Sequence, residues 1–160
     1  MPGSTLSRRV AFITGGGSGI GLGIAGAFVD EGAAVALFSR NLERLEQARA
    51  QLLDRGAHTV IIHAGDVRDP QSVSAAMSAV VDGAGGIDVL VNNAAGNFVC
   101  PAESMSSNAW KSVVDIDLNG TFHCCQAAYP YLASSPYGGR IISIVSDQAR
   151  HGWPGCAHAG

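Results

Sequence analysis

A glycine cluster near the start of the chain has the residue types and spacing of a phosphate-binding loop. The stretch TGGGSGIG (residues 14–21) follows a short apolar run and precedes a helix-like segment. In such a loop Gly15 makes the tight turn, Gly19 lets the backbone approach a pyrophosphate, and Gly21 permits close helix–strand packing. The N–H groups and partial positive charge of the helix N-terminus attract phosphate. Glycines also mark ordinary turns, but the flanking strand and helix favour a dinucleotide site formed by Gly15, Gly17, Ser18, Gly19 and Ile20.

The end of the second apolar run distinguishes the two nicotinamide cofactors. NAD sites usually place an acidic residue there to bind the ribose 2′-OH. This chain has Ser39 and Arg40 instead, with no acid before Glu43. The planar guanidinium of Arg40 can pair with a 2′-phosphate, and Ser39 adds a hydroxyl. The alternative is that Arg40 is a solvated residue at a helix start. The position favours NADP(H).

Asp66 and Val67 follow the third apolar run and are also candidates for cofactor binding. They would lie at the carboxyl edge of a parallel sheet, where ligands bind in open α/β folds. Asp66 can accept a hydrogen bond from the adenine amino group while Val67 packs on the ring. The alternative role for Asp66 is a helix N-cap, but Asp69, followed by Pro70, is better placed for that.

Strand and helix signals alternate along the whole chain, and these elements must position the candidate residues. Strands are expected at 8–14, 33–40, 58–67, 87–96 and 138–146, and helices at 20–32, 41–56, 69–85 and 107–132. Strands that are apolar on both faces indicate a parallel sheet covered by helices. Right-handed crossovers then favour a doubly wound sheet of order 3-2-1-4-5. The sequence therefore predicts an α/β, Rossmann-type fold in one domain spanning residues 1–160.

Composition excludes several classes of protein. Hydrophobic residues make up 47% and charged residues 14% of the chain, which argues against disorder. The net charge of −3 and the scattered basic residues argue against a nucleic-acid partner. No apolar run is long enough for a membrane span or a signal peptide. The cysteines and histidines have no metal-ligand spacing, so we expect free thiols and no metal.

The glycine loop, together with NNAAG (residues 92–96) after the fourth strand, resembles the short-chain dehydrogenase/reductase family over essentially the whole chain. The resemblance implies that the Asn-Asn-Ala segment supports the central sheet, and that Asn93, Ala94 and Ala95 lie along the nicotinamide ribose. The longer stretch NNAAGNF looks like the 2,4-dienoyl-CoA reductases, and NFVCPAESMSSNAW is similar to their peroxisomal-type branch. This branch implies NADPH-dependent reduction of 2,4-dienoyl-CoA to 3-enoyl-CoA in the β-oxidation of unsaturated fatty acids.

Asp117 stands where most members of the family have an asparagine that holds a water of the proton relay. An aspartate can also hold that water and, unlike asparagine, can donate a proton. Burial would raise its pKa and suit it to an acid role near neutral pH. We expect apolar neighbours to bury it, namely Ile116, Leu118 and Phe122, while Asp115 and Asn119 are better placed to be wet. The alternative is a helix aspartate that faces solvent.

Ser146 aligns with the family's catalytic serine at the tip of the fifth strand. The catalytic tyrosine is expected thirteen residues later, where this chain has Ala159, and the lysine would fall beyond Gly160. The peroxisomal-type reductases likewise carry HAG before Ala-Lys and have no tyrosine there. Proton delivery to carbon does not require that tyrosine, since Asp117 and its water can supply it. Hydrogen bonds from Ser146 or the backbone could support the enolate oxygen.

The same resemblance implies acyl-CoA contacts from Arg40, Phe98, Ser106, Ser107 and Asn108. Phe98 could equally be a packing residue, and His158 could either line the substrate pocket or make a loop hydrogen bond. Two other functions stay open: a relative that acts on a carbonyl or alcohol, and an inactive nucleotide-binding fragment. We expect the C-terminal part of the fold to be missing, which leaves the fifth strand an exposed hydrophobic edge. The full-length protein is expected to be a homo-oligomer, peroxisomal in a eukaryote and cytoplasmic in a bacterium.

Overall fold

The computed structural model of the chain describes residues 5–158, which contain one five-stranded sheet. All neighbouring strands are parallel, and their order is β3-β2-β1-β4-β5, which confirms the predicted doubly wound α/β arrangement. The strands are β1 Val10–Thr14, β2 Ala34–Ser39, β3 Val60–Ala64, β4 Val89–Asn92 and β5 Arg140–Ser143. Their carboxyl ends therefore meet at one edge of the sheet, where the loops that follow them converge.

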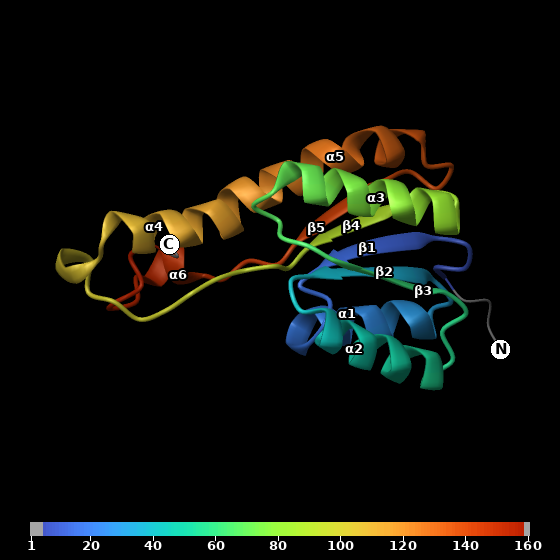
Figure 1. Cartoon of the computed structure of the whole chain (residues 1–160), viewed down its shortest axis with the longest axis horizontal. Coiled ribbons are helices and arrows are strands. Elements are labelled where there is room, and N and C mark those ends of the chain that lie inside the picture. The colour runs from blue at the N-terminus through green and yellow to red at the C-terminus, as the bar shows by residue number, and fades with distance from the viewer. Residues whose placement is uncertain (1–4, 159–160) are drawn as a thin grey trace.

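Helices cover both faces of this sheet (Figure 1). α1 (Gly19–Asp30) and α2 (Leu42–Asp54) lie on one face, and α3 (Pro70–Ala84) and α5 (Gly120–Ser134) on the other. Successive residues of a strand point to opposite faces, so Phe12 packs in the cluster under α3 and α5 while Ile13 packs in the cluster with α1 and α2. Strands that are apolar on both sides are buried for this reason.

Local sequence signals account for most helix ends. The Asp69 side chain accepts a 3.0 Å hydrogen bond from the Gln71 N–H, and Pro70 opens α3, so the predicted N-cap is confirmed. Gly32 and Gly56 have φ angles of 81° and 103° just beyond α1 and α2. These left-handed conformations favour glycine and end the two helices.

The predicted helix over residues 107–132 is one helical run with a π-helical turn inside it. The run consists of α4 (Ser107–Val114), the π-turn (Asp115–Asn119) and α5. In the π-turn the Gly120 N–H bonds to the carbonyl of Asp115, five residues back. A Cβ on Gly120 would lie 2.6 Å from the Val67 side chain, so only glycine allows this approach. Such turns are rare and occur frequently at functional sites.

Part of the chain extends beyond the carboxyl edge of the sheet (Figure 1). It includes the loop after β4 with its 3₁₀ turn (Ala102–Ser104), α4, and α6 (Gln148–His151). On the sheet itself β5 is the exposed hydrophobic edge that we expected, with Ile141 and Ile142 50% and 41% exposed.

Membrane-spanning helices, metal-ligand clusters and disulfides were sought in the described part of the chain. Between residues 5 and 158 no helix combines the length and hydropathy needed to cross a membrane. The same residues contain no group of three potential metal ligands. The four cysteines are free thiols.

Candidate active site

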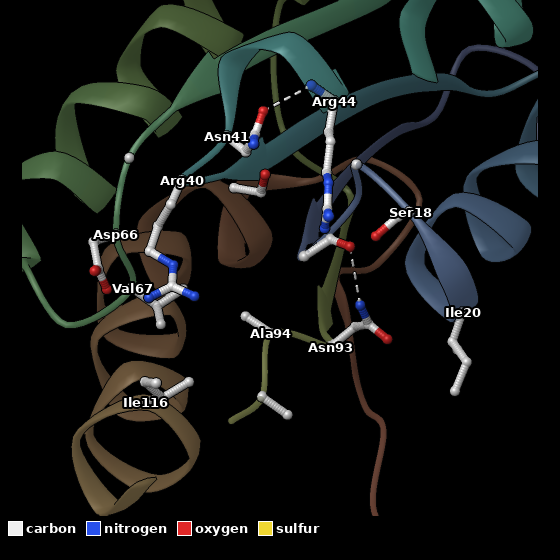
Figure 2. Close-up of a pocket in the computed structure, with 15 residues that line it drawn as sticks. Ser18, Ile20, Arg40, Asn41, Arg44, Asp66, Val67, Asn93, Ala94 and Ile116 are labelled. Atoms are coloured by element: carbon white, nitrogen blue, oxygen red, sulfur yellow. Dashed lines mark hydrogen bonds between the residues drawn. The ribbon is translucent and has the colours of Figure 1, made fainter. Parts of the chain in front are cut away.

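An open cavity of about 810 Å³ lies at the carboxyl ends of the strands (Figure 2). The glycine loop, the end of β2, the loop after β3 and the loop after β4 form its walls. All predicted cofactor residues except Gly19 line it, namely Gly15, Gly17, Ser18, Ile20, Ser39, Arg40, Asp66, Val67, Asn93, Ala94 and Ala95. Gly19 lies in the same loop with φ +55°, and a Cβ there would face open space. The structure therefore brings the predicted set together in one place.

The glycine loop is packed too tightly for side chains at two positions. Gly15 has a φ of +65°, a conformation that favours glycine. A Cβ on Gly21 would lie 2.5 Å from the Gly15 carbonyl oxygen and 2.6 Å from Nδ2 of Asn93. The Ser18 side chain makes no capping hydrogen bond at the start of α1. Unsatisfied N–H groups at this helix start can therefore bind a phosphate.

Buried Thr14 ties the end of β1 to the segment after β4. Its Oγ1 accepts 2.9 Å hydrogen bonds from the backbone N–H groups of both Asn93 and Ala94. The Asn93 side chain donates to the Thr14 carbonyl at 3.0 Å, and the Asn92 side chain donates to the Cys125 sulfur in α5 at 3.3 Å. These bonds fix the Asn-Asn-Ala segment beneath the glycine loop. Thr14 was not among the predicted site residues, because its role depends on residues 79 and 80 positions away.

Two arginines, rather than one, lie beyond the end of β2: Arg40 directly after the strand and Arg44 in the first turn of α2. Arg40 and Arg44 both line the cavity, and within residues 5–158 neither forms a salt bridge. In Figure 2 Arg40 points toward Val67 while Arg44 runs down toward the glycine loop. The Arg44 Cβ lies only 3.5 Å from where a Cβ on Gly17 would be. Arg44 was not predicted, because it lies in the first turn of α2 rather than at the strand end that distinguishes the two cofactors.

Asp66 faces the cavity as an ionised carboxylate. It accepts hydrogen bonds of 2.6 to 3.0 Å from the Arg68 guanidinium and one of 3.0 Å from the Arg68 backbone N–H. These bonds lower the pKa of Asp66 below its ordinary value, although partial burial opposes them. An ionised carboxylate is an acceptor only, as an adenine amino group would require.

Asp117 lies in the π-turn, and its carboxyl Oδ1 accepts a 2.8 Å hydrogen bond from the backbone N–H of Gly96. Burial raises the pKa of Asp117 above its ordinary value, while the hydrogen bond from Gly96 opposes the rise. Oδ2 of Asp117 has no hydrogen-bond partner among the described residues. The carboxyl group is thus held by one oxygen and free to exchange a proton at the other.

The surroundings of Asp117 differ from those expected. The prediction that Leu118 and Phe122 bury it is wrong, because these side chains are 67% and 60% exposed. The loop after β4 covers Asp117 instead, and Ile116 packs against that loop, 2.8 Å from where a Cβ on Gly96 would lie. A change of register in the π-turn turns the neighbouring side chains away from the positions that a regular helix would give them.

The π-turn contains a second aspartate, Asp115, two residues before Asp117, and its carboxyl group is ionised. It forms a salt bridge with Lys111 and accepts a 2.9 Å hydrogen bond from Asn119. These contacts lower the pKa of Asp115. The two neighbouring carboxyl groups are therefore shifted in opposite directions, and only Asp117 is suited to carry a proton.

The end of the described chain packs on the loop after β4. The Cys100 N–H donates to the Gly155 carbonyl at 2.8 Å, and the His158 ring stacks on Phe98 with centroids 4.4 Å apart. His158 therefore contacts this loop, one of the two roles considered for it. Ser146 is exposed in the segment after β5. Ala159, at the position expected for the family's tyrosine, lies outside the described residues.

A second cavity of about 350 Å³ lies beside α4 and the last described residues. It is lined by Ala102, Met105, Ser106, Ser107, Trp110 and Ala157. Of the predicted substrate residues, Ser106 and Ser107 line it, whereas Phe98 and Asn108 line neither cavity. Arg40 belongs to the cofactor cavity. The Ser106 hydroxyl caps α4 by accepting from the Ala109 N–H at 3.2 Å, a structural role that the sequence analysis did not assign.

Comparison with known proteins gives the family. The family model described as short chain dehydrogenase matches residues 9–158. The chain belongs to the short-chain dehydrogenase family. A curated relative, peroxisomal 2,4-dienoyl-CoA reductase [(3E)-enoyl-CoA-producing] of Danio rerio, is 42% identical over 155 residues, covering 97% of this chain and 51% of that protein. A relative with a different name is also similar. D-threitol dehydrogenase of Mycolicibacterium smegmatis is 43% identical over 145 residues, covering 90% of this chain and 55% of that protein.

Solved structures agree with this family. The crystal structure of NAD⁺-bound xylitol dehydrogenase is similar with a TM-score of 0.92 and 30% identity, covering 98% of this chain and 60% of the other. The cofactor in that structure supports a nicotinamide cofactor for this short-chain dehydrogenase. The chain spans about half the length of the curated relatives it matches.

Proposed function

We propose that the full-length protein reduces 2,4-dienoyl-CoA to 3-enoyl-CoA with NADPH, in the β-oxidation of unsaturated fatty acids. The observation that carries this proposal is the carboxyl group of Asp117. It is bound to Gly96 through Oδ1, is free at Oδ2, and has a raised pKa. Asp117 itself lines neither cavity, but the preceding residue, Ile116, lines the cofactor cavity. The dienoyl-CoA reductase named above supports the substrate class.

The proposed reaction needs an acid that protonates carbon. The cofactor, when bound, supplies a hydride to the substrate chain, and the resulting negative charge spreads to the thioester oxygen. Asp117 then donates its proton from Oδ2 to carbon, directly or through a water, and solvent returns a proton to the carboxylate. Ser146 or a backbone N–H stabilises the thioester oxygen while it carries charge. Overall, one hydride and one proton add to the dienoyl thioester.

NADPH is proposed over NADH because of the charges at the end of β2. Arg40 and Arg44 line that corner of the cavity with Ser39, and none of these residues could repel a 2′-phosphate. Glu43, the nearest acid in sequence, does not line the cavity. Two guanidinium groups can form charge-assisted hydrogen bonds to a phosphate, whereas a ribose 2′-OH gains little from them.

We place the acyl-CoA between the cofactor cavity and the second cavity. Ser106 and Ser107 line the second cavity, and its apolar members, Met105 and Trp110, can contact an acyl chain. Phe98 and Asn108 remain candidates for contacts outside both cavities, and Arg40 for a phosphate of the coenzyme A. The peroxisomal relative supports a peroxisomal location in a eukaryote. We also propose a cytoplasmic location in a bacterium and a homo-oligomer as the full-length form.

A dehydrogenase acting on an alcohol or carbonyl is the second candidate. It is favoured by the 43% identity with D-threitol dehydrogenase. Such an enzyme needs an acid at the developing alkoxide, and this chain has alanine at residue 159 where the family's tyrosine is expected. An inactive nucleotide-binding fragment is the third candidate for the 160-residue chain itself.

One assay distinguishes these candidates. NADPH oxidation is followed with 2,4-hexadienoyl-CoA, and NADP⁺ reduction with D-threitol or xylitol, on the full-length gene product and on the 160-residue chain. Turnover of the dienoyl-CoA by the full-length protein supports the proposal. Turnover of the polyols alone would overturn it. Activity in the full-length protein with NADPH binding but no turnover in the 160-residue chain would identify that chain as an inactive fragment.

A further inference from the structure

His158 is almost fully buried at the end of the described chain. It is 5% exposed, its ring stacks on Phe98 at an interplanar angle of 16°, and its Nε2 lies 2.9 Å from Oδ1 of Asn97. Residues 97 and 98 therefore contact the same imidazole through two different interactions. His158 is 61 positions from Asn97 in the sequence, so the end of the described chain fixes the loop after β4.

The partners of Asn97 determine which imidazole nitrogen carries hydrogen. Oδ1 of Asn97 also lies 2.8 Å from the Phe98 backbone nitrogen. A backbone N–H can only donate, so the Asn97 atom that it meets must be the acceptor oxygen. Nε2 of His158 must then be the second donor to that oxygen. Its other nitrogen, Nδ1, is buried without a partner among the described residues, which is typical of a neutral imidazole with Nδ1 unprotonated.

The loop held by His158 is also the loop that holds Asp117. Gly96, next to Asn97, donates its N–H to Oδ1 of Asp117 at 2.8 Å. Three consecutive residues are thus fixed from two sides, by the carboxyl group on one and by the imidazole on the other. If the bond from His158 is lost, Asn97 loses its contact with the imidazole, and the direction of the neighbouring Gly96 N–H is less firmly fixed.

We propose that His158 is a positioning residue for Asp117. Its Nε2–H bond to Asn97 and its stacking on Phe98 fix the loop so that the Gly96 N–H meets the Asp117 carboxyl group. This role deepens the proposed function, since it assumes that Asp117 is the proton donor.

Three variants separate the contributions of His158. His158→Phe keeps an aromatic ring against Phe98 but removes the donor to Asn97. His158→Gln places an amide N–H near the position of Nε2 and keeps the donor. Asn97→Ala removes the acceptor and leaves the imidazole in place, which tests the same bond if the substitution of His158 prevents folding. His151→Gln is the matched control, because His151 is exposed on α6 and its partner within residues 5–158 is Asp147.

Two measurements are made on the full-length protein. The first is kcat and KM for 2,4-hexadienoyl-CoA together with the Kd for NADPH. We expect His158→Phe and Asn97→Ala to lower kcat by about 10- to 100-fold, the cost of a misplaced catalytic group, with the Kd for NADPH unchanged. His158→Gln should recover most of the loss, and His151→Gln should match the wild type. The second is the pKa of Asp117, followed by carbon NMR of its carboxyl group.

The NMR titration gives a result that does not depend on turnover. The Gly96 N–H stabilises the carboxylate, so its displacement should raise the pKa of Asp117 further in His158→Phe and Asn97→Ala but not in His158→Gln. If the wild type does not reduce dienoyl-CoA but the two variants show these pKa changes, the proposed function is overturned and the positioning of Asp117 by His158 is supported. If the wild type is active and both variants keep its kcat and its Asp117 pKa, the role of His158 is overturned while the proposed function is retained.

Discussion

The backbone N–H of Gly96 donates a 2.8 Å hydrogen bond to Oδ1 of Asp117 and joins the loop after β4 to the π-turn between α4 and α5. The bond has two consequences for the carboxyl group. It fixes the orientation of the group, and it stabilises the charged form against the effect of burial. The pKa of Asp117 is raised in spite of it, so desolvation is the stronger effect.

Asp117→Asn should abolish most turnover while leaving cofactor binding intact. The amide oxygen can still accept from Gly96, so the loop keeps its place, but the side chain no longer has an acidic proton. General acid catalysis contributes about 10²- to 10⁴-fold, and we expect a loss of kcat in this range. The measurements are kcat with 2,4-hexadienoyl-CoA and the Kd for NADPH by fluorescence. A variant as fast as the wild type would remove Asp117 from the mechanism.

The pH dependence of the wild type should follow the raised pKa of Asp117. Asp117 donates its proton in the acid form, so kcat should be highest below the pKa of this group and should fall as the pH rises through it. Because burial raises that pKa, the fall should lie above the ordinary carboxyl value of 3.8. The check is a pH profile of kcat at saturating substrate, with Asp115→Asn as the control, since the pKa of Asp115 is lowered. A profile without this falling limb would contradict the acid role.

The same shift affects stability with a defined sign. The folded protein keeps the Asp117 proton to a higher pH than the unfolded chain does, so unfolding releases protons in the interval between the two pKa values. The stabilisation by this group is therefore complete below the unfolded pKa and is lost as the pH rises through the folded pKa. Urea unfolding of the wild type and of Asp117→Asn should show the difference, because the variant lacks this dependence.

Arg40→Gln and Arg44→Gln should each weaken NADPH binding and leave NADH binding nearly unchanged. Both guanidinium groups line the cavity at the end of β2. A hydrogen bond to a charged group contributes about 1.5–3 kcal/mol, so each substitution should raise the Kd for NADPH by roughly 10- to 100-fold. Arg49→Gln on the exposed side of α2 is the matched control. Equal losses for the two cofactors would show that the arginines do not discriminate at the 2′ position.

Much of the fold could be predicted because its signals are local. Alternating apolar runs and glycine-terminated helices indicated five strands and their order. The fourth strand illustrates the limit, since it was expected to reach residue 96 but ends at Asn92. The next two backbone N–H groups turn to the side chain of Thr14 on another strand. Such a bond depends on the tertiary fold and leaves no local pattern in the sequence.

In the candidate site, too, some residues had local sequence signals and others depend on the tertiary fold. The cofactor residues were predictable because they follow the ends of parallel strands, which meet at one edge. The π-turn at Asp117 was not, because it depends on the contact between Gly120 and Val67, 53 positions apart, and it exposes Leu118 and Phe122 instead of burying them. The pairing of His158 with Asn97 was likewise hidden, since the two residues are 61 positions apart in the sequence.

Gly21→Ala and Gly23→Ala form a matched pair on α1 that tests the packing of the cofactor loop. An added Cβ at residue 21 would lie 2.5 Å from the Gly15 carbonyl, whereas one at residue 23 would meet nothing within 4 Å. Overpacking of this kind costs about 1–3 kcal/mol, while alanine in an exposed helix interior is favoured over glycine by about 1 kcal/mol. Gly21→Ala should therefore lower the free energy of unfolding and weaken NADPH binding, because the backbone of the loop must move.

Gly23→Ala should keep the wild-type Kd for NADPH and should unfold at a higher urea concentration. Urea denaturation and NADPH fluorescence titration measure both effects on the same protein samples. If Gly21→Ala bound NADPH as tightly as Gly23→Ala does, the close approach of α1 to Gly15 and Asn93 would not be needed for the cofactor site. The glycine at residue 21 would then serve the stability of the fold alone.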